Sequence, residues 1–267
     1  MPQDTFIITL PPRQLPALQG WRVTPAHLAY RLGPGPHLFR ADNTVPRGGL
    51  MVLGDRGFDG LGPTAPLCQE ILREAQARGF SGAVLDFESR LPPLEQIAGQ
   101  LDEQFTRRGW MLCVNEGYAA RAPHARVMIP SALSGGSLQR RLVEALERFG
   151  ENRVILALEK RAEDFTLPSP TGSGKPLSAQ ELEELRQRLA PSLFFSGELC
   201  ARYFTYMSRE SGGHFVLFDD GDTLCRKVEV ARRLGIHMFM APWAEVSPHA
   251  AQMGIQRRQE QQRQGRR

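Results

Sequence analysis

The stretch Gly82-Ala83-Val84-Leu85-Asp86-Phe87-Glu88 reads as a strand that ends in two carboxylates. Its first four residues are apolar, as expected for a strand buried on both faces of a parallel sheet. Asp86 and Glu88 are two residues apart, so both side chains project to the same side as Val84, while the residues between them face the helix layer. Neighbouring carboxylates repel each other, which raises the pKa of one of them. A general acid needs such a raised pKa.

Similar short apolar segments alternate with helical patterns along the whole chain. Eight of them are candidate strands: Phe6–Leu10, His27–Leu32, Gly49–Gly54, Gly82–Glu88, Trp110–Asn115, Arg126–Ser131, Arg153–Glu159 and His237–Trp243. Strands that alternate with helices predict βα units around a parallel sheet. The chain has 267 residues, and a (β/α)8 barrel needs about 250 residues. We therefore predict an α/β fold, a single (β/α)8 TIM barrel over residues 1–255.

The segments between the strands are unequal. Amphipathic patterns predict four helices: Pro66–Arg78, Leu94–Arg108, Ser137–Phe149 and Thr223–Leu234. Asp222 is in position to cap the last of these helices. Between Leu10 and His27 the sequence is rich in proline, so the first helix is expected to be degenerate.

The segment between Glu159 and His237 is too long for one βα unit. It contains a helix that opens with the capping-box sequence 178–181, followed by the strand-like pieces 203–208 and 214–218. We predict a small subdomain, residues 165–220, inserted before the last strand. Such insertions often shape a binding cleft. Tyr203 and Tyr206 either line that cleft or pack the subdomain.

The positive charge of the chain is concentrated at its C-terminal end. Residues 256–267 carry five Arg and one Glu, a net charge of +4, which equals the charge of the whole chain. The barrel is therefore expected to be near neutral, and no nucleic-acid partner is expected. The segment 256–267 is predicted to be a basic, disordered tail that aids solubility. The alternative is that it binds an anionic partner.

Other classes of protein leave no signature in the sequence. No apolar run reaches the roughly 18 residues of a membrane span, and the start Met1–Thr5 lacks the pattern of a secretory signal. A cytoplasmic protein, or one exported by an unusual route, is therefore expected. Cys68, Cys113, Cys200 and Cys225 match no metal spacing. We expect free thiols, no metal and no organic cofactor. Nothing in the sequence predicts an oligomeric state.

Two segments carry a family resemblance. Gly79–Glu88 resembles the strand-four signature of glycoside hydrolase family 18, the chitinase-like enzymes, which reads roughly Phe-Asp-Gly-x-Asp-x-Asp-Trp-Glu. The matching positions are Phe80, Gly82, Asp86, Phe87 as an aromatic residue, and Glu88. The segment His214–Trp243 resembles the closing part of that family. It has a strand, an acidic pair, a capped helix with a lysine, and a last strand that ends in Trp.

The resemblance implies a substrate-assisted mechanism without a cofactor. Glu88 would protonate the glycosidic oxygen, and the nucleophile would be the 2-acetamido oxygen of the substrate itself. Asp86 would bind that acetamido group, and Trp243 would form a floor under the sugar ring. The alternatives are that Asp86 and Glu88 form an ion-pair or helix-cap pair, and that Trp243 is a core residue.

The sequence also departs from the family pattern. Ser81 and Val84 replace the two outer aspartates of the signature, and Ser131 stands where a tyrosine of the sixth strand is expected. The tyrosine normally helps to hold the acetamido group, and Tyr118 is the candidate for a replacement hydroxyl. Other polar residues expected at the same end of the barrel are Asp55, Arg56, Asn115, Glu116 and Glu159.

Two functions remain open. The first is a glycosidase that cleaves β-linked N-acetylhexosamine glycans, chitin-like or peptidoglycan-like, and Glu88 favours it. The second is a carbohydrate-binding barrel with weak or lost turnover, which the missing sixth-strand tyrosine favours. The remaining alternative is another barrel hydrolase. In either of the first two cases the expected partner is a glycan.

Overall fold

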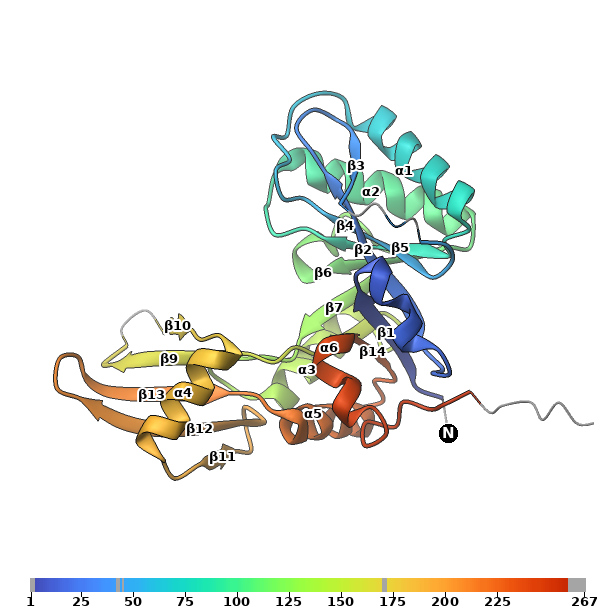
Figure 1. The fold of residues 1–267 in the computed structure, drawn as a ribbon. Coiled ribbons are helices and arrows are strands. Elements are labelled where there is room, and N and C mark those ends of the chain that lie inside the picture. Colours follow the sequence, from blue (N-terminus) through green and yellow to red (C-terminus); the bar gives the residue numbers. More distant parts are fainter. Residues whose placement is uncertain (1–2, 42–43, 45, 170–171, 259–267) are drawn as a thin grey trace, which may run out of the picture.

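The computed structural model describes residues 3–41, 44, 46–169 and 172–258, and its centre is a closed ring of eight parallel strands (Figure 1). The strands are β1 (Thr5–Leu10), β2 (Thr24–Leu32), β4 (Leu50–Gly54), β5 (Gly82–Asp86), β6 (Met111–Asn115), β7 (Arg126–Pro130), β8 (Val154–Ala157) and β14 (Met238–Pro242). They pair in this order, and β1 pairs with both β14 and β2, which closes the ring. The predicted (β/α)8 barrel is confirmed.

Alternate residues of the strands fill the inside of the barrel. They form one buried apolar cluster: Ile7, Ala26, Leu50, Val52, Val84, Cys113, Met128, Ile155 and Met240. Leu85 and Phe87 lie in a second cluster, on the outside of the barrel wall. Successive side chains of a strand point to opposite faces, so the side that carries Val84 also carries Asp86, as predicted.

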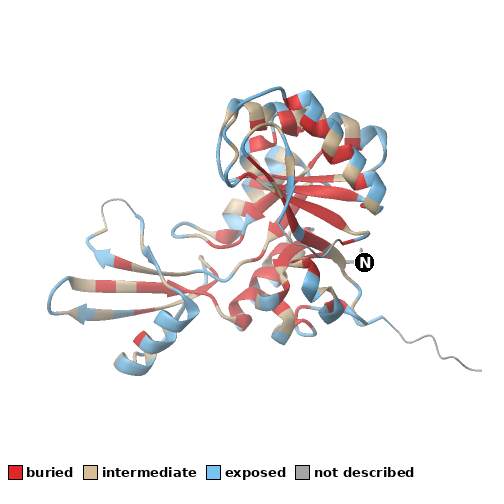
Figure 2. Ribbon diagram, turned by 45° about the horizontal axis from the view of Figure 1, so that its top comes forward, coloured by how far each residue is buried: buried red, intermediate tan, exposed pale blue. Residues whose placement is uncertain are grey.

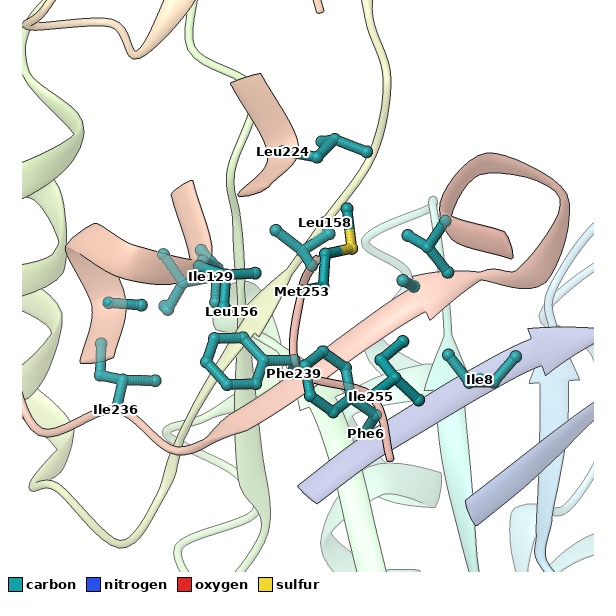
Figure 3. Close-up of a cluster of buried hydrophobic side chains, with 14 of the residues drawn as sticks. Phe6, Ile8, Ile129, Leu156, Leu158, Leu224, Ile236, Phe239, Met253 and Ile255 are labelled. Atoms are coloured by element: carbon teal, nitrogen blue, oxygen red, sulfur yellow. The ribbon is translucent and has the colours of Figure 1, made fainter. Parts of the chain in front are cut away.

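Two groups of helices cover opposite sides of the barrel (Figure 1). Helices α1 (Thr64–Arg78) and α2 (Pro92–Arg107) pack on one side. On the other side lie α3 (Leu138–Phe149), α5 (Gly221–Arg233) and the short α6 (Trp243–Val246). Figure 3 shows part of the apolar cluster under α3, α5 and α6, in which Phe6 and Phe239 stack with ring centroids 4.9 Å apart.

The first two βα units are short, as the sequence indicated. A 3-10 helix, η1 (Pro12–Leu18), joins β1 to β2, and β3 (Leu38–Arg40) pairs antiparallel with β2 outside the ring. One helix cap differs from the prediction. Asp220, rather than Asp222, caps α5, because the helix begins at Gly221 and the Asp220 Oδ1 accepts the N–H of Thr223 at 2.9 Å.

The segment between β8 and α5 folds as an arm that projects from the barrel (Figures 1 and 2). Its antiparallel sheet contains β9 (Ala162–Leu167), β10 (Lys175–Pro176), β11 (Phe194–Ser196), β12 (Ala201–Ser208) and β13 (Gly212–Phe218). The helix α4 (Ala179–Leu189) begins with the predicted capping box, from Ser178 to Glu181, and covers one face of this sheet over Phe204, Val216 and Phe218. The predicted insertion in the barrel is therefore present.

The chain's last described residues pack against the segment that precedes β2. Arg257 pairs with Trp21 in an isolated bridge, and its guanidinium lies 4.3 Å from the centre of the Trp21 ring. Residues 259–267 of the predicted tail lie outside the described residues. None of the helices among the described residues combines the length and the apolar character needed to cross a bilayer.

Candidate active site

The carboxylate pair lies at the end of the barrel where the parallel strands finish. Asp86 is the last residue of β5, and Glu88 follows two residues later. Both residues are exposed, and neither side chain makes a hydrogen bond or an ion pair with another described residue. The pKa of Asp86 is raised, first by desolvation at the barrel end and then by the charges of Glu88 and Asp55. The two carboxylates are thus electrostatically coupled and available to a ligand.

The raised pKa of Asp86 predicts a stability cost at neutral pH. The folded protein favours the protonated form, so ionisation of Asp86 costs stability as the pH rises above the ordinary Asp pKa of about 3.9. Asp86→Asn removes this cost and is expected to stabilise the protein at pH 7 by less than about 1 kcal/mol, because solvent screens the charge of an exposed side chain. The gain should vanish near pH 3. Thermal unfolding at both pH values measures it.

Asp59→Asn is the control, because its effect on stability at pH 7 should have the opposite sign. The backbone N–H groups of Leu61 and Gly35 lower the pKa of Asp59, so its substitution should destabilise the protein at pH 7. If Asp86→Asn instead destabilises the protein at pH 7, the expected stability cost of ionised Asp86 is contradicted.

A buried carboxylate that follows the neighbouring strand holds the backbone of Glu88. Asp55 follows β4 and is 4% exposed. Its two oxygens accept the N–H groups of Glu88 at 2.9 Å and of Ser89 at 2.8 Å. Hydrogen bonds to a charged acceptor are about twice as strong as neutral ones. Asp55 therefore fixes the position from which the Glu88 side chain extends.

Asp55→Asn is expected to loosen this loop and to cost about 1–3 kcal/mol, because an amide has one acceptor oxygen where the carboxylate has two. Hydrogen exchange of the Glu88 and Ser89 amides should become faster. Urea unfolding measures the stability. The matched control is Asp59→Asn, which removes a carboxylate that also accepts two backbone N–H groups, but on another loop. Unchanged exchange at Glu88 and Ser89 in Asp55→Asn would contradict this role.

Two side chains at the end of β6 hold the same loop from the other side. The Asn115 Nδ2 donates to the carbonyl of Phe87 at 2.6 Å, and the hydroxyl of Tyr118 donates to the carbonyl of Ser89. The Tyr118 ring is buried and packs edge-on against Phe87 with centroids 5.5 Å apart. Burial, followed by the charges of Asp55 and Glu95, raises the pKa of Tyr118 to about 12. The Tyr118 hydroxyl, which was predicted to contact a substrate, instead donates to the backbone of the loop that carries Glu88.

A cleft of about 380 Å³ opens beside Glu88. Four of the predicted residues line it: Glu88, Asn115, Glu116 and Tyr118. Other lining residues were not predicted: Phe87, Arg90, Gly117, Met128, Pro130, Ala132, Leu133, Arg141 and Arg161. Glu116 is also engaged with α3, since it pairs with Arg141 and with Arg148, the latter at 3.2 Å.

The sixth strand of the barrel requires a correction. Met128 points into the barrel, so alternation places Pro130 on the inner side and Ser131 on the outer side. Pro130 lines the cleft, whereas Ser131 is fully buried and its hydroxyl accepts the N–H of Glu159 at 3.4 Å. The position expected for the family's tyrosine is thus Pro130 rather than Ser131.

Glu159 follows β8 on the inner side of the strand, by alternation from Ile155 and Ala157. Its carboxylate lies 3.5 Å from the guanidinium of Arg161, which lines the cleft. Glu159 is not a lining residue itself, but it lies near the cleft because it pairs with Arg161.

The structure places Trp243 elsewhere than the resemblance implied. Met238 and Met240 belong to the inner cluster, so the odd-numbered residues of this strand face outward, and Trp243 follows them. Its side chain is 9% exposed and packs edge-on against Trp21 with centroids 5.6 Å apart. Trp243 is therefore a residue of the outer core, and it does not form a floor under Asp86.

Asp55 is the main site residue whose role the sequence did not assign. Its position just after a strand was visible, but its partners lie 33 and 34 residues away in the chain. As for a metal, no group of three or more His, Cys, Asp or Glu side chains among the described residues has the arrangement to hold one.

The fold is a (β/α)8 barrel that carries a carboxylate pair at the carboxyl end of its fourth strand. No protein-family model and no curated protein matches the sequence. Solved structures do match in fold. The chitinase from Chromobacterium violaceum is 15% identical, covers 95% of this chain and 100% of its own, and has a TM-score of 0.68.

Two further solved structures share the fold. The spore cortex-lytic enzyme SleL from Bacillus megaterium is 16% identical over 90% of this chain and 70% of its own, with a TM-score of 0.63. A class V chitinase from Pseudomonas fluorescens is 13% identical over 94% and 98% of the two chains, with a TM-score of 0.63. At these identities the likeness establishes a shared fold.

Proposed function

We propose that this protein is a retaining glycosidase that cleaves β-linked N-acetylhexosamine glycans of the chitin or peptidoglycan kind. The observation that carries the proposal is the placement of Asp86 and Glu88. Both carboxylates are exposed, and neither has a partner among the described residues, at the end of the barrel where barrel enzymes hold their active sites. Structural similarity to chitinases and to a cortex-lytic enzyme supports the same substrate class.

The geometry suits substrate-assisted hydrolysis. Glu88 projects beside the cleft from a backbone fixed by Asp55, and it protonates the glycosidic oxygen as the bond breaks. The 2-acetamido oxygen of the substrate attacks the anomeric carbon, and the Asp86 carboxylate stabilises the cationic ring that forms. Glu88 then takes a proton from the incoming water, which gives a product with retained configuration.

A carbohydrate-binding protein with little turnover is the second candidate. Pro130 favours it, because proline has no hydroxyl to hold an acetamido group at the inner position of β7. The Tyr118 hydroxyl does not take the place of the missing one, since it already donates to the carbonyl of Ser89.

The test is release of reducing ends from acetylated chitin oligomers and from purified peptidoglycan, with NMR of the fresh product. Cleavage with a β-anomeric product supports the proposed enzyme, and the better substrate decides between the two glycans. An α-anomeric product would exclude the substrate-assisted route. Binding of the oligomers without cleavage would support the second candidate.

A further inference from the structure

The end of the barrel opposite the carboxylate pair contains a larger pocket, of about 690 Å³. It lies where the strands begin, since Asp4 precedes β1, Arg22 precedes β2 and His237 precedes β14. Its lining residues are Gln3, Asp4, Phe6, Arg22, Arg232, Arg233, His237, Gly254 and Gln256. The proposed glycosidase reaction uses none of them.

Two cationic or potentially cationic side chains of this pocket are held in place by Asp4. The Arg232 Nε donates to Asp4 Oδ2 at 2.7 Å, and the His237 Nδ1 lies 2.9 Å from Asp4 Oδ1. The Arg232 Nη2 also donates to the carbonyl of Met253 at 2.5 Å. The Arg232 Nη1 and the His237 Nε2 make no hydrogen bond with another described residue. The pocket therefore presents one oriented guanidinium donor, the Arg232 Nη1.

The positive charge of the pocket exceeds its negative charge. Arg22 and Arg233 are exposed and have no acidic partner among the described residues, and Asp4 is the only carboxylate among the lining residues. Three guanidinium groups and one carboxylate give a net charge of +2. Arg257 extends this charge beyond the pocket, since it lies over Trp21 beside Arg22. Positive charge is thus concentrated at the end of the barrel where the strands begin.

We propose that this pocket is a binding site for the phosphate group of a phosphate monoester or of free phosphate. Guanidinium groups match the oxygens of phosphate in a two-pronged geometry, which makes arginine the preferred residue at such sites. The net charge of +2 balances the charge of about −1.5 to −2 that a phosphate monoester carries at pH 7. A carboxylate ligand would leave part of the positive charge unbalanced.

Calorimetric titration of the full chain with inorganic phosphate and with a hexose 6-phosphate, at low ionic strength, tests the site. We expect one molecule bound per chain and at least tenfold weaker binding in the double variant Arg22→Gln/Arg233→Gln. Both side chains are exposed, so the fold should persist, which circular dichroism checks. The matched control is Arg107→Gln/Arg140→Gln, which removes two exposed arginines from α2 and α3.

The two ligands separate the sources of the phosphate group. Tighter binding of the hexose phosphate indicates a phosphorylated ligand, and equal binding indicates phosphate itself. Absence of binding at millimolar concentration of both ligands overturns the proposal, as does equal loss in the control variant. The measurement requires no glycan cleavage, so it stands apart from the proposed enzymatic function.

Discussion

Replacement of Glu88 by Gln is expected to lower the kcat of glycan hydrolysis by about 10²–10⁴-fold, the usual contribution of a general acid. The amide keeps the size and polarity of the side chain but cannot give a proton to the leaving oxygen. The backbone bond of Glu88 to Asp55 involves the N–H group, so the loop should keep its structure. Initial rates on an acetylated chitin oligomer measure the effect, and calorimetry should find oligomer binding intact.

The control for this substitution is Glu103→Gln. Glu103 is a two-thirds exposed residue of α2 that pairs with Arg107 on the helix surface, so its change should leave both rate and binding unaltered. If Glu88→Gln cleaves as fast as the unchanged protein, Glu88 is not the acid. If both proteins bind and neither cleaves, the barrel is a sugar-recognition module.

Lys227→Met is expected to reduce the free energy of unfolding by about 3–5 kcal/mol, the cost of leaving a buried charge unpaired. The Lys227 Nζ lies 2.7 Å from Asp219 Oδ1, and the two side chains are 1% and 4% exposed. Asp219 also accepts the hydroxyl of Thr223 at 2.8 Å. The pair ties the middle of α5 to the residue that follows β13, so its loss weakens the junction of the arm with the barrel.

The double variant Asp219→Asn/Lys227→Met separates the charge from the packing. With both charges removed, the double variant should be more stable than Lys227→Met alone, as measured by urea unfolding. Equal stabilities of the two variants would mean that the loss comes from packing, and that the ion pair itself is not the source.

The eight strands could be predicted because each strand carries its own signal. A strand buried on both faces must be apolar along its length, and such runs are visible in one sequence. The same holds for the helix cap at Ser178, where the required hydrogen bonds depend on a few adjacent residues. The end of β5 was predictable too, since Asp86 and Glu88 lie only two residues apart in the chain.

Distant contacts and strand ends were not predictable in this way. Alternation holds within a strand, but a shift of one residue in the match to a family pattern moves a side chain to the other face. This is why Ser131 and Trp243 were expected inside the barrel and lie outside it. The hydroxyl of Tyr118 was visible as a polar group, but its bond to Ser89 depends on the approach of two loops.

By itself, the sequence determined the barrel, the inserted sheet and the position of the carboxylate pair at a strand end, because local apolar and polar patterns specify each of them. Only the tertiary structure decided what surrounds the pair. Asp55 fixes Glu88 from another strand, Pro130 rather than Ser131 faces the cleft, and Arg22 and Arg232 meet in one basic pocket although 210 residues separate them. Such meetings depend on how the ring of strands closes, and no short segment of the chain contains that information.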